Sequence, residues 1–264
     1  MEKIKLLFTC PHNGAKKGTT TNPPIIERVS ERFPINICPP LDGQGFSIKD
    51  DVRARKITEK IVENIQSLSG KDPYTVYAEF KRDWIDYNRK ERCAVDPDSP
   101  NGIDEYNKYH DAIKEKIEEM LPGGDTSLAF LFDIHGTDDD KSPPDIDREV
   151  NFIELLIGTD QTRSRQALTR EDPHYFWDPT NGLIPLLNKR GIIAFPEDEI
   201  QEQQSFPLDG GHTIKTYGGP ERRKPGLVAI QIEVIRCIRD HEYFLEKFAA
   251  DMAGCILKFV HPFV

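Results

Sequence analysis

The chain has 264 residues, of which 37% are hydrophobic and 30% are charged, which is enough to bury a substantial core in one large domain or two small ones. Its formal charge of −10 argues against nucleic acid as the main partner, because nucleic acids select a basic face. No apolar segment approaches the roughly 20 residues of a membrane span, and the amino-terminal apolar run is too short for a secretory signal. We therefore expect a cytoplasmic protein with no membrane partner.

Hydrophobic patterning predicts alternating strands and helices. Apolar runs predict strands at residues 4–10, 74–80, 127–133, 151–157, 192–195 and 227–234. Apolar residues three and four apart predict a helix at residues 49–69, and further helices are expected at 103–121, 179–189 and 239–259. Polar or proline-rich stretches predict loops at 83–101 and 137–147, and a long glycine-containing segment covers 196–226.

This order of elements predicts the fold class. Nearly continuous apolar strands are typical of sheets covered on both faces. Their alternation with helices favours a three-layer α/β/α fold with a mixed, mostly parallel central sheet, and we expect a single domain over residues 1–264. Ligands of such sheets bind beyond the carboxyl ends of the strands. Three predicted strands end in side chains capable of chemistry: Cys10-Pro11-His12, Asp133-Ile134-His135 and Gln231-Ile232-Glu233.

Two histidines, His12 and His135, follow predicted strands and are closely followed by a glycine that lets the backbone turn. Two imidazoles and one carboxylate are a common ligand set for catalytic zinc. Asp133 points the same way as His135 on a strand, where it could accept the second imidazole N–H. Hydrogen-bonded structural histidines and an aspartate that caps the next turn are the alternative interpretation.

The carboxylate that would complete such a metal site has several candidates. Asp50 and Asp51 open a predicted helix, where each could serve as a ligand or as the N-cap. Asp42, Glu27 and the acidic residues 138–140 compete with them, although the last three are typical of a solvated loop.

Glu233 stands inside the apolar sequence AIQIEVIR. A charged side chain in a buried strand is costly unless it is paired or functional. Beside a metal ion, a glutamate can take a proton from bound water and pass it to a leaving amine. The alternative is a salt bridge with Arg236 or another arginine.

The stretch FKRDWIDYNRK brings Arg82, Asp86, Asn88 and Arg89 together just after a predicted strand. Arginine presents a planar fork suited to a carboxylate, so these residues could hold an acidic substrate. A charged surface loop is the alternative.

The five cysteines are odd in number and widely spaced, which is typical of reduced thiols rather than of a disulfide framework. Cys10 could be catalytic, but a small buried residue at a strand end is the favoured interpretation.

Four elements, TCPHNG, WIDYNR, FDIHG and AIQIEVIR, occur in the order typical of the N-formylglutamate amidohydrolase family, and DGGHTIKTYGGP resembles its glycine-rich stretch. The resemblance extends over roughly residues 6–240. It implies a zinc-carboxypeptidase-like fold, with His12 and His135 as zinc ligands and Glu233 as the catalytic carboxylate.

The same resemblance implies a substrate-binding set. Asn88 and Arg89 would grip a substrate carboxylate, with Arg82 as a weaker match. Gly210, Gly211 and Tyr217 would shape the pocket wall.

The chain departs from the zinc carboxypeptidases at one ligand position. Those enzymes place a glutamate three residues after the first histidine, where this chain has Ala15. The third ligand must come from elsewhere, and Asp51 is our choice, with Asp50 as the alternative. The acidic sequence TDDDKSPPDID after FDIHG bears on the substrate rather than on the metal.

These observations predict a hydrolase with one zinc ion per chain. It would cleave the amide bond of a small acidic substrate, either an N-acyl (N-formyl) acidic amino acid or a glutamyl peptide, and the oligomeric state stays open. One alternative is a manganese ureohydrolase, which shares DxH but needs further aspartates on a distant strand; here Asp145-Ile146-Asp147 lies in a proline-rich loop. The other alternative is a non-catalytic protein of the same fold that binds a carboxylate ligand.

Overall fold

The structure of the protein is a computed structural model that describes residues 2–29, 32–33, 49–123, 125, 127–137, 155–159, 168, 174–196, 210–218 and 224–264. The described strands are β1 (Lys3–Cys10), β2 (Asp72–Tyr77), β3 (Ala129–Thr137), β4 (Leu155–Gly158), β5 (Ala194–Phe195) and β6 (Leu227–Ile235). The described α-helices are α1 (Ala54–Ser69), α2 (Glu91–Ala94), α3 (Pro100–Met120), α5 (Leu183–Lys189), α7 (His212–Tyr217), α8 (Arg236–Asp240) and α9 (Glu242–Val260).

The described strands form one six-stranded sheet with the order β2-β1-β3-β6-β4-β5. β1 pairs in parallel with β2 and β3, and β3 pairs in parallel with β6. β4 runs antiparallel to β6 and parallel to β5. The predicted mixed, mostly parallel sheet is therefore confirmed. The strands β1, β3 and β6, whose ends carry the candidate chemistry, are neighbours in it.

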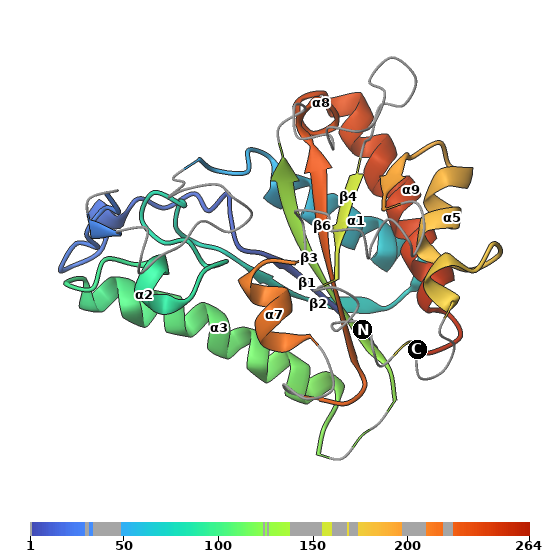
Figure 1. Cartoon of the computed structure of the whole chain (residues 1–264), viewed down its shortest axis with the longest axis horizontal. Helices are drawn as coiled ribbons and strands as arrows, with labels where there is room; N and C mark the ends of the chain where they lie inside the picture. The colour runs from blue at the N-terminus through green and yellow to red at the C-terminus, as the bar shows by residue number, and fades with distance from the viewer. Residues whose placement is uncertain are drawn as a thin grey trace.

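Helices cover both faces of this sheet, which gives the predicted three-layer arrangement (Figure 1). α1, α5 and α9 pack on one face, where their apolar side chains meet Phe8 and Phe132. α3 and α7 pack on the other face, against Leu7 and Leu131. Neighbouring residues of one strand contribute to different cores because successive side chains of a strand point to opposite faces.

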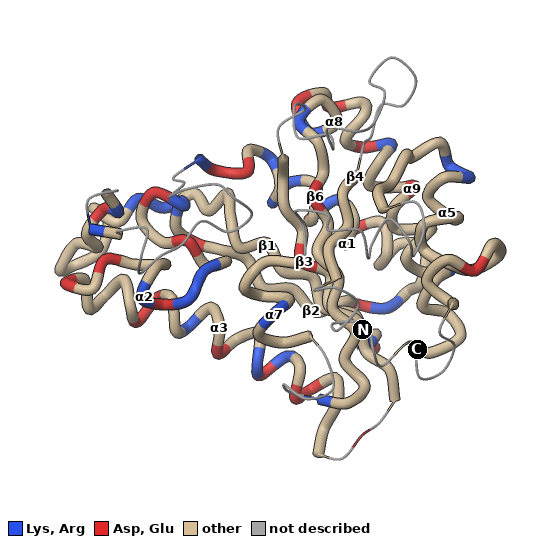
Figure 2. Tube along the Cα trace, viewed as in Figure 1, with Lys and Arg blue, Asp and Glu red and all other residues tan. Residues whose placement is uncertain are grey.

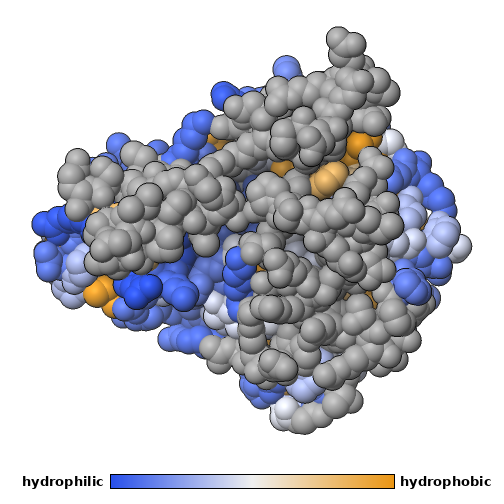
Figure 3. All heavy atoms as spheres, viewed as in Figure 1, coloured by the Kyte–Doolittle hydropathy of each residue, from blue (hydrophilic) through white to orange (hydrophobic). Residues whose placement is uncertain are grey.

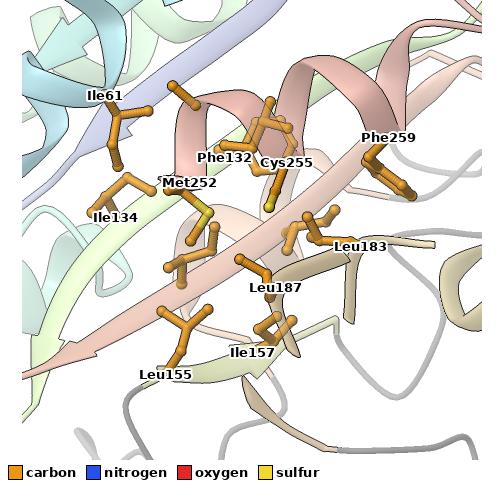
Figure 4. Packing of buried hydrophobic residues seen from close by; sticks show 14 of the residues in the cluster. Ile61, Phe132, Ile134, Leu155, Ile157, Leu183, Leu187, Met252, Cys255 and Phe259 are labelled. Carbon is orange, nitrogen blue, oxygen red and sulfur yellow. The ribbon is translucent and has the colours of Figure 1, made fainter. Parts of the chain in front are cut away.

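Buried hydrophobic side chains of the sheet, α5 and α9 pack together in one cluster (Figure 4). β3 contributes Phe132 and Ile134 to it, and α9 contributes Met252, Cys255 and Phe259. Complete burial of an aliphatic or aromatic side chain of this kind stabilises a fold by roughly 1.5–3 kcal/mol. The apolar contacts on this face hold the strands in place, and the polar candidate residues of β3 and β6 lie on the opposite face.

Strand alternation places the polar residues on the face that carries α3 and α7. On this face of β3, the apolar Leu131 is followed by Asp133 and His135. On the same face of β6, Gln231 and Glu233 stand in register with those two residues. This face therefore changes from apolar to polar toward the carboxyl ends of the strands, which is where ligand sites of such sheets lie.

Several boundaries differ from those predicted. The strand predicted at 127–133 continues to Thr137, so His135 lies inside β3 rather than after it. The helix predicted from residue 49 begins only at Ala54, because Arg53 has a left-handed φ of 63°. The loop predicted at 83–101 contains α2, and the closing helix is divided into α8 and α9 at His241.

The cysteines correct another prediction. Cys93 is disulfide-bonded, so the expectation of five reduced thiols is wrong, whereas Cys10, Cys237 and Cys255 form no disulfide. Because disulfides are rare in the cytosol, the thiols give no support to the predicted cytoplasmic location, which stays a prediction. None of the described helices combines the length and the apolar character that a membrane span requires.

Charged residues are concentrated in the helices and connections and are sparse along the strands (Figure 2). On the face shown in Figure 3, the described surface is mainly hydrophilic. A group of charged side chains buried beside the carboxyl ends of β1, β3 and β6 is the exception to this distribution, and it includes most of the residues that the sequence singled out.

Candidate active site

His12 lies just beyond the end of β1 and is 2% exposed. Asn13 follows it with a left-handed φ of 68°, a conformation that asparagine tolerates better than most residues, so the chain turns directly after the imidazole. Nδ1 of His12 lies 2.9 Å from Oδ2 of Asp51, and Nε2 of His12 lies 2.9 Å from Oδ1 of Asp86. Both ring nitrogens therefore face buried carboxylates.

His135 reaches the same place from β3. Its Nδ1 lies 3.1 Å from the same Oδ2 of Asp51, and its Nε2 lies 3.0 Å from Oδ2 of Asp133. The ring centroids of His12 and His135 are 4.9 Å apart and the rings are nearly perpendicular. The predicted contact between Asp133 and the second imidazole nitrogen is confirmed. Thr9 holds that carboxylate in turn by donating to its other oxygen at 2.5 Å.

Asp51 approaches the histidines from the tight turn that precedes α1. No side chain caps this helix, whose N-cap position is Arg53, so the predicted N-cap role of Asp50 or Asp51 is wrong. The carboxylate of Asp51 instead accepts the main-chain N–H of Gly136 at 3.2 Å in addition to its two histidine contacts. Asp50 is occupied elsewhere, because it accepts the main-chain N–H of Arg82 at 2.9 Å.

His12, Asp51 and His135 form a buried group whose ligand atoms all lie within 4.8 Å of one another. We call it the His–Asp–His group. Imidazole nitrogens and carboxylate oxygens are ligands that zinc and related divalent metals prefer. Each ring nitrogen of both histidines lies beside a carboxylate oxygen. Without a metal, hydrogen bonds at all four nitrogens would require both rings to be protonated, with a total charge of +2. One divalent cation supplies the same charge. The donor set therefore fits a divalent metal ion.

Asp86 is the partner of His12 that the sequence did not reveal. It is fully buried, and its Oδ2 accepts the Nε–H of Arg82 at 2.9 Å and that of Arg89 at 3.2 Å. Arg28 lies 3.8 Å away. A carboxylate on Nε2 of a ligand histidine fixes the tautomer that leaves Nδ1 free for a metal. Asp86 is placed to do this for His12, and Asp133 is placed to do it for His135.

These contacts shift the pKa values of the buried groups. Burial alone would raise the pKa of Asp51, but the two adjacent histidines hold it well below its usual value. Burial likewise opposes ionisation of Asp86, yet Arg82 and the adjacent imidazole keep its pKa well below its usual value. For His135, burial favours the neutral ring, but Asp133 and its other acidic neighbours raise the pKa well above its usual value. Opposite charges in the site therefore stabilise one another.

Arg82 and Arg89, which were predicted to bind a substrate carboxylate, both use their Nε–H groups on Asp86. Arg82 also donates from Nη1 to the carbonyl of Lys49 at 3.3 Å and lies 3.6 Å from Oδ1 of Asp51. Arg89 is 6% exposed, and in the described part of the chain its Nη atoms have no protein acceptor. The guanidinium group of Arg89 is therefore anchored through Nε, and its two Nη groups remain for another acceptor. Its role in substrate binding stays a prediction.

Asn88 connects α7 with the histidines. Its Oδ1 accepts the main-chain N–H of Thr213 at 3.1 Å, which leaves Nδ2 3.3 Å from Nε2 of His135. Because Asp133 takes the Nε2 proton, the Asn88 N–H groups cannot donate to that nitrogen. Gly211 packs directly on this amide, and a Cβ there would overlap the Asn88 side chain. A side chain at position 211 would therefore have to displace the Asn88 amide.

Glu233 lies beside His135, since the two are register partners in the parallel pairing of β3 and β6. Its Oε1 accepts the Nε2–H of Gln231 at 2.8 Å, and Oε1 of Gln231 accepts the main-chain N–H of Gly211. A main-chain N–H can only donate, so the amide oxygen of Gln231 must face Gly211 and the amide nitrogen must face Glu233. A buried amide therefore orients the predicted catalytic carboxylate.

Two other predicted residues stand apart from the His–Asp–His group. Tyr217 is fully buried, and its hydroxyl lies 2.8 Å from Nδ1 of His110 on α3, so its described contact joins α7 to α3 and its part in a pocket wall stays a prediction. Cys10 is buried, its thiol donates to the carbonyl of His12 at 3.1 Å, and burial raises its pKa. The interpretation of Cys10 as a small buried residue is confirmed.

Of the remaining candidate ligands, only Glu27 lies among the described residues, and it does not belong to the group. Glu27 is exposed, and Asp42 and residues 138–140 lie outside the described residues, as does Asp145-Ile146-Asp147. Gly210, the other glycine predicted in the pocket wall, has a left-handed φ of 85° directly before Gly211.

The sequence holds indications of two contacts that were not predicted, those of Asp86 with its arginines and of Gln231 with Glu233. Asp86 has an arginine four residues before it and another three residues after it, a spacing that suits a paired carboxylate. Gln231 precedes Glu233 by two residues on a predicted strand, so both side chains had to share a face.

Comparison with known proteins bears on the fold. Neither a protein-family model nor a curated protein sequence matches the chain. The solved structure of an N-formylglutamate amidohydrolase from Ralstonia eutropha JMP134 is similar, with a TM-score of 0.59 and 15% identity over 100% of this chain and 95% of that one. A gene product from Agrobacterium tumefaciens is also similar, with a TM-score of 0.54 and 14% identity over 99% of this chain and 92% of that one. The fold expected from the resemblance is therefore confirmed.

Proposed function

We propose that the chain is a zinc-dependent hydrolase that cleaves the amide bond of an N-acyl acidic amino acid, such as an N-formyl amino acid, or of a glutamyl peptide. The observation that carries this proposal is the position of Glu233 beside His135, at the edge of a buried group able to hold a divalent ion. The similarity of fold to an N-formylglutamate amidohydrolase supports the same chemistry.

The metal ligands would be His12, Asp51 and His135, with one ion per chain. A zinc ion bound by three protein ligands lowers the pKa of its water toward ~7 and polarises a substrate carbonyl. Asp86 and Asp133 would accept the Nε2 protons, which would leave both Nδ1 atoms available to hold the ion. Burial of these groups keeps competing water away from the imidazoles.

Glu233 would be the general base and then the general acid. Gln231 holds its carboxylate by a hydrogen bond of 2.8 Å, which restricts the directions in which the carboxylate can point. The carboxylate takes a proton from the attacking water and returns it to the departing nitrogen. The same proton is therefore taken up and released within one catalytic cycle.

Arg89 and Asn88 would bind the carboxylate of the substrate. Arg89 is anchored through Nε on Asp86, which leaves the two Nη groups to form a paired contact with a carboxylate. Asn88 adds N–H groups that its own protein contacts do not consume. Arg82 would contribute positive charge next to both, so an acidic substrate is favoured over a neutral one.

The two alternatives use only part of this site. A manganese ureohydrolase needs more aspartates around a second ion, and the described residues hold the single His–Asp–His group. A carboxylate-binding protein without catalysis would use Arg89 and Asn88 but would not need Glu233 beside His135. A hydrolase with one metal ion would use all of these residues, which supports the proposal.

Metal analysis combined with a substrate screen tests the proposal. The purified protein should contain about one zinc ion per chain and should hydrolyse N-formyl and N-acyl derivatives of glutamate or aspartate, or γ-glutamyl peptides, faster than the matching derivatives of leucine. About two manganese ions per chain with guanidine hydrolysis would favour the ureohydrolase. Tight binding of a dicarboxylate without turnover or metal would favour the binding protein.

A further inference from the structure

Arg239 of α8 is a buried arginine, 3% exposed, that donates only to main-chain carbonyl groups among the described residues. Its Nε donates to the carbonyl of Val234 at 2.9 Å, and its Nη2 donates to that of Thr137 at 2.8 Å. Its Nη1 donates to the carbonyl of Val52. One guanidinium group therefore joins three segments that are far apart in the sequence.

Each of these carbonyl groups belongs to a residue that lies within two positions of a residue of the proposed site. Val52 directly follows Asp51, and Val234 directly follows Glu233. Thr137 ends the strand that carries His135. The three segments supply two of the three proposed metal ligands and the proposed base, so their spacing decides the geometry of the site.

Gly136 fits closely against the same guanidinium group. A Cβ at this position would overlap the Cζ, Nε and Nη1 atoms of Arg239. The main-chain N–H of Gly136 donates to Asp51 at 3.2 Å. Gly136 therefore contacts both the guanidinium group and a proposed metal ligand. Arg53 adds a second link, because its Nη1 donates to the carbonyl of Arg239 at 3.1 Å.

The free-energy cost of burying the Arg239 guanidinium argues for a role beyond stabilising the fold. Burying a cation without a carboxylate partner is costly, and no acidic side chain pairs with Arg239 in the described part of the chain. Only the planar fork of arginine can direct rigid N–H groups at three acceptors at once, whereas lysine concentrates its charge on one atom. The arrangement of the three N–H donors, and not the positive charge alone, therefore distinguishes arginine from lysine at position 239.

We propose that Arg239 is a positioning residue that sets the spacing of Asp51, His135 and Glu233 and so tunes metal binding. This inference rests on the proposed function. Among the described residues, the Arg239 side chain donates to main-chain carbonyl groups and not to the proposed ligand side chains. A side chain at position 136 would have to displace the guanidinium group.

Metal binding and the visible spectrum of the Co²⁺-loaded protein test this role in Arg239→Lys. The Zn²⁺ dissociation constant, measured by competition with a chromogenic chelator, should rise about 10- to 100-fold, as for other changes behind metal ligands. The ligand-field bands of Co²⁺ should shift because the ligands change their spacing. Arg236→Lys is the matched control, since Arg236 lies on the same helix and its side chain is 59% exposed; it should leave both quantities unchanged.

The outcomes separate the inference from the proposed function. If the wild type binds neither Zn²⁺ nor Co²⁺, the proposed function fails and the inference fails with it. If the wild type binds and Arg239→Lys binds equally tightly with the same spectrum, only the inference fails, even if the melting temperature falls. If Arg239→Lys does not fold, Gly136→Ala decides, because its methyl group displaces the guanidinium: weakened binding supports the role and an unchanged dissociation constant overturns it.

Discussion

Glu233 and His135 are register partners on adjacent parallel strands, so their side chains leave the sheet side by side. This relationship puts a carboxylate next to a proposed metal ligand without making it a member of the His–Asp–His group. The proposed base would have to lie close to the water that the metal would bind without being a metal ligand itself. The pairing of β3 with β6 is consistent with both conditions.

The proposed role of Glu233 predicts that metal binding and turnover can be separated. Glu233→Gln should lower kcat by about 10²- to 10⁴-fold, the range typical of a lost general base, while the zinc content stays at that of the wild type. Steady-state kinetics and metal analysis on the same preparation measure both. Glu246→Gln, on exposed α9 surface with 47% side-chain exposure, should change neither. Wild-type turnover in Glu233→Gln would remove this residue from the mechanism.

The contacts of Asp86 predict two effects of one substitution. Asp86→Asn leaves Arg82 and Arg89 without their carboxylate, so the metal-free protein should lose roughly 3–5 kcal/mol of unfolding free energy. It should also bind Zn²⁺ about 10- to 100-fold more weakly, because Nε2 of His12 loses its anionic partner. Urea unfolding and chelator competition measure these effects. Asp98→Asn, whose side chain is 74% exposed, is the control, and equal stability of the two variants would contradict the account.

Much of the fold and part of the site could be predicted because they depend on local patterns. The period of two along a strand is enough to put Asp133 on the same side as His135. Apolar runs that alternate with helical patterns are enough to predict a covered, mostly parallel sheet. The strand ends of β1, β3 and β6 then meet at one edge because a parallel sheet aligns its carboxyl ends.

The remaining features depend on contacts between distant segments, which a single sequence does not show. Asp51 reaches the histidines because Arg53 adopts a left-handed conformation that delays the helix, and nothing in DDVRA requires that turn. The contact of Asp86 with His12 and the three carbonyl contacts of Arg239 depend on how loops and α8 fold back on the sheet. The disulfide of Cys93 was missed because an odd cysteine count favoured reduced thiols.

The contact between Gly211 and Asn88 predicts a change in substrate binding. In Gly211→Ala the new methyl group displaces the Asn88 amide, so KM for an acidic substrate should rise at least about tenfold, the cost of roughly one lost hydrogen bond to a charged group. Zn²⁺ affinity should stay the same. Gly254→Ala is the control, because a Cβ there meets no atom within 4 Å. A wild-type KM in Gly211→Ala would show that Asn88 does not contact the substrate.

His110 predicts a pH dependence of stability that is independent of the metal. Burial, with a smaller effect from His212, lowers the pKa of His110 from 6.5 to about 4. Above pH 6.5 the ring is neutral in the folded and unfolded states, so stability is unaffected. Between 6.5 and about 4 the unfolded state binds the proton first, so stability falls as pH falls, by up to roughly 3 kcal/mol.

Urea unfolding of the metal-free protein at several pH values between 4 and 7 measures this slope. His110→Gln keeps a donor for the carbonyl of Tyr87, which Nε2 of His110 contacts at 3.1 Å, but it cannot titrate. The variant should therefore lose less stability than the wild type as the pH decreases. Parallel curves for the two proteins would show that His110 does not titrate in this way.

The central claim is that His12, Asp51 and His135 together bind one divalent ion. Elemental analysis of proteins purified side by side tests it most directly. The wild type and His261→Ala, which changes an exposed histidine, should each contain about one zinc ion per chain, whereas His12→Ala and His135→Ala should contain almost none. Equal metal content in all four folded proteins, or no metal in the wild type after incubation with Zn²⁺, would contradict it.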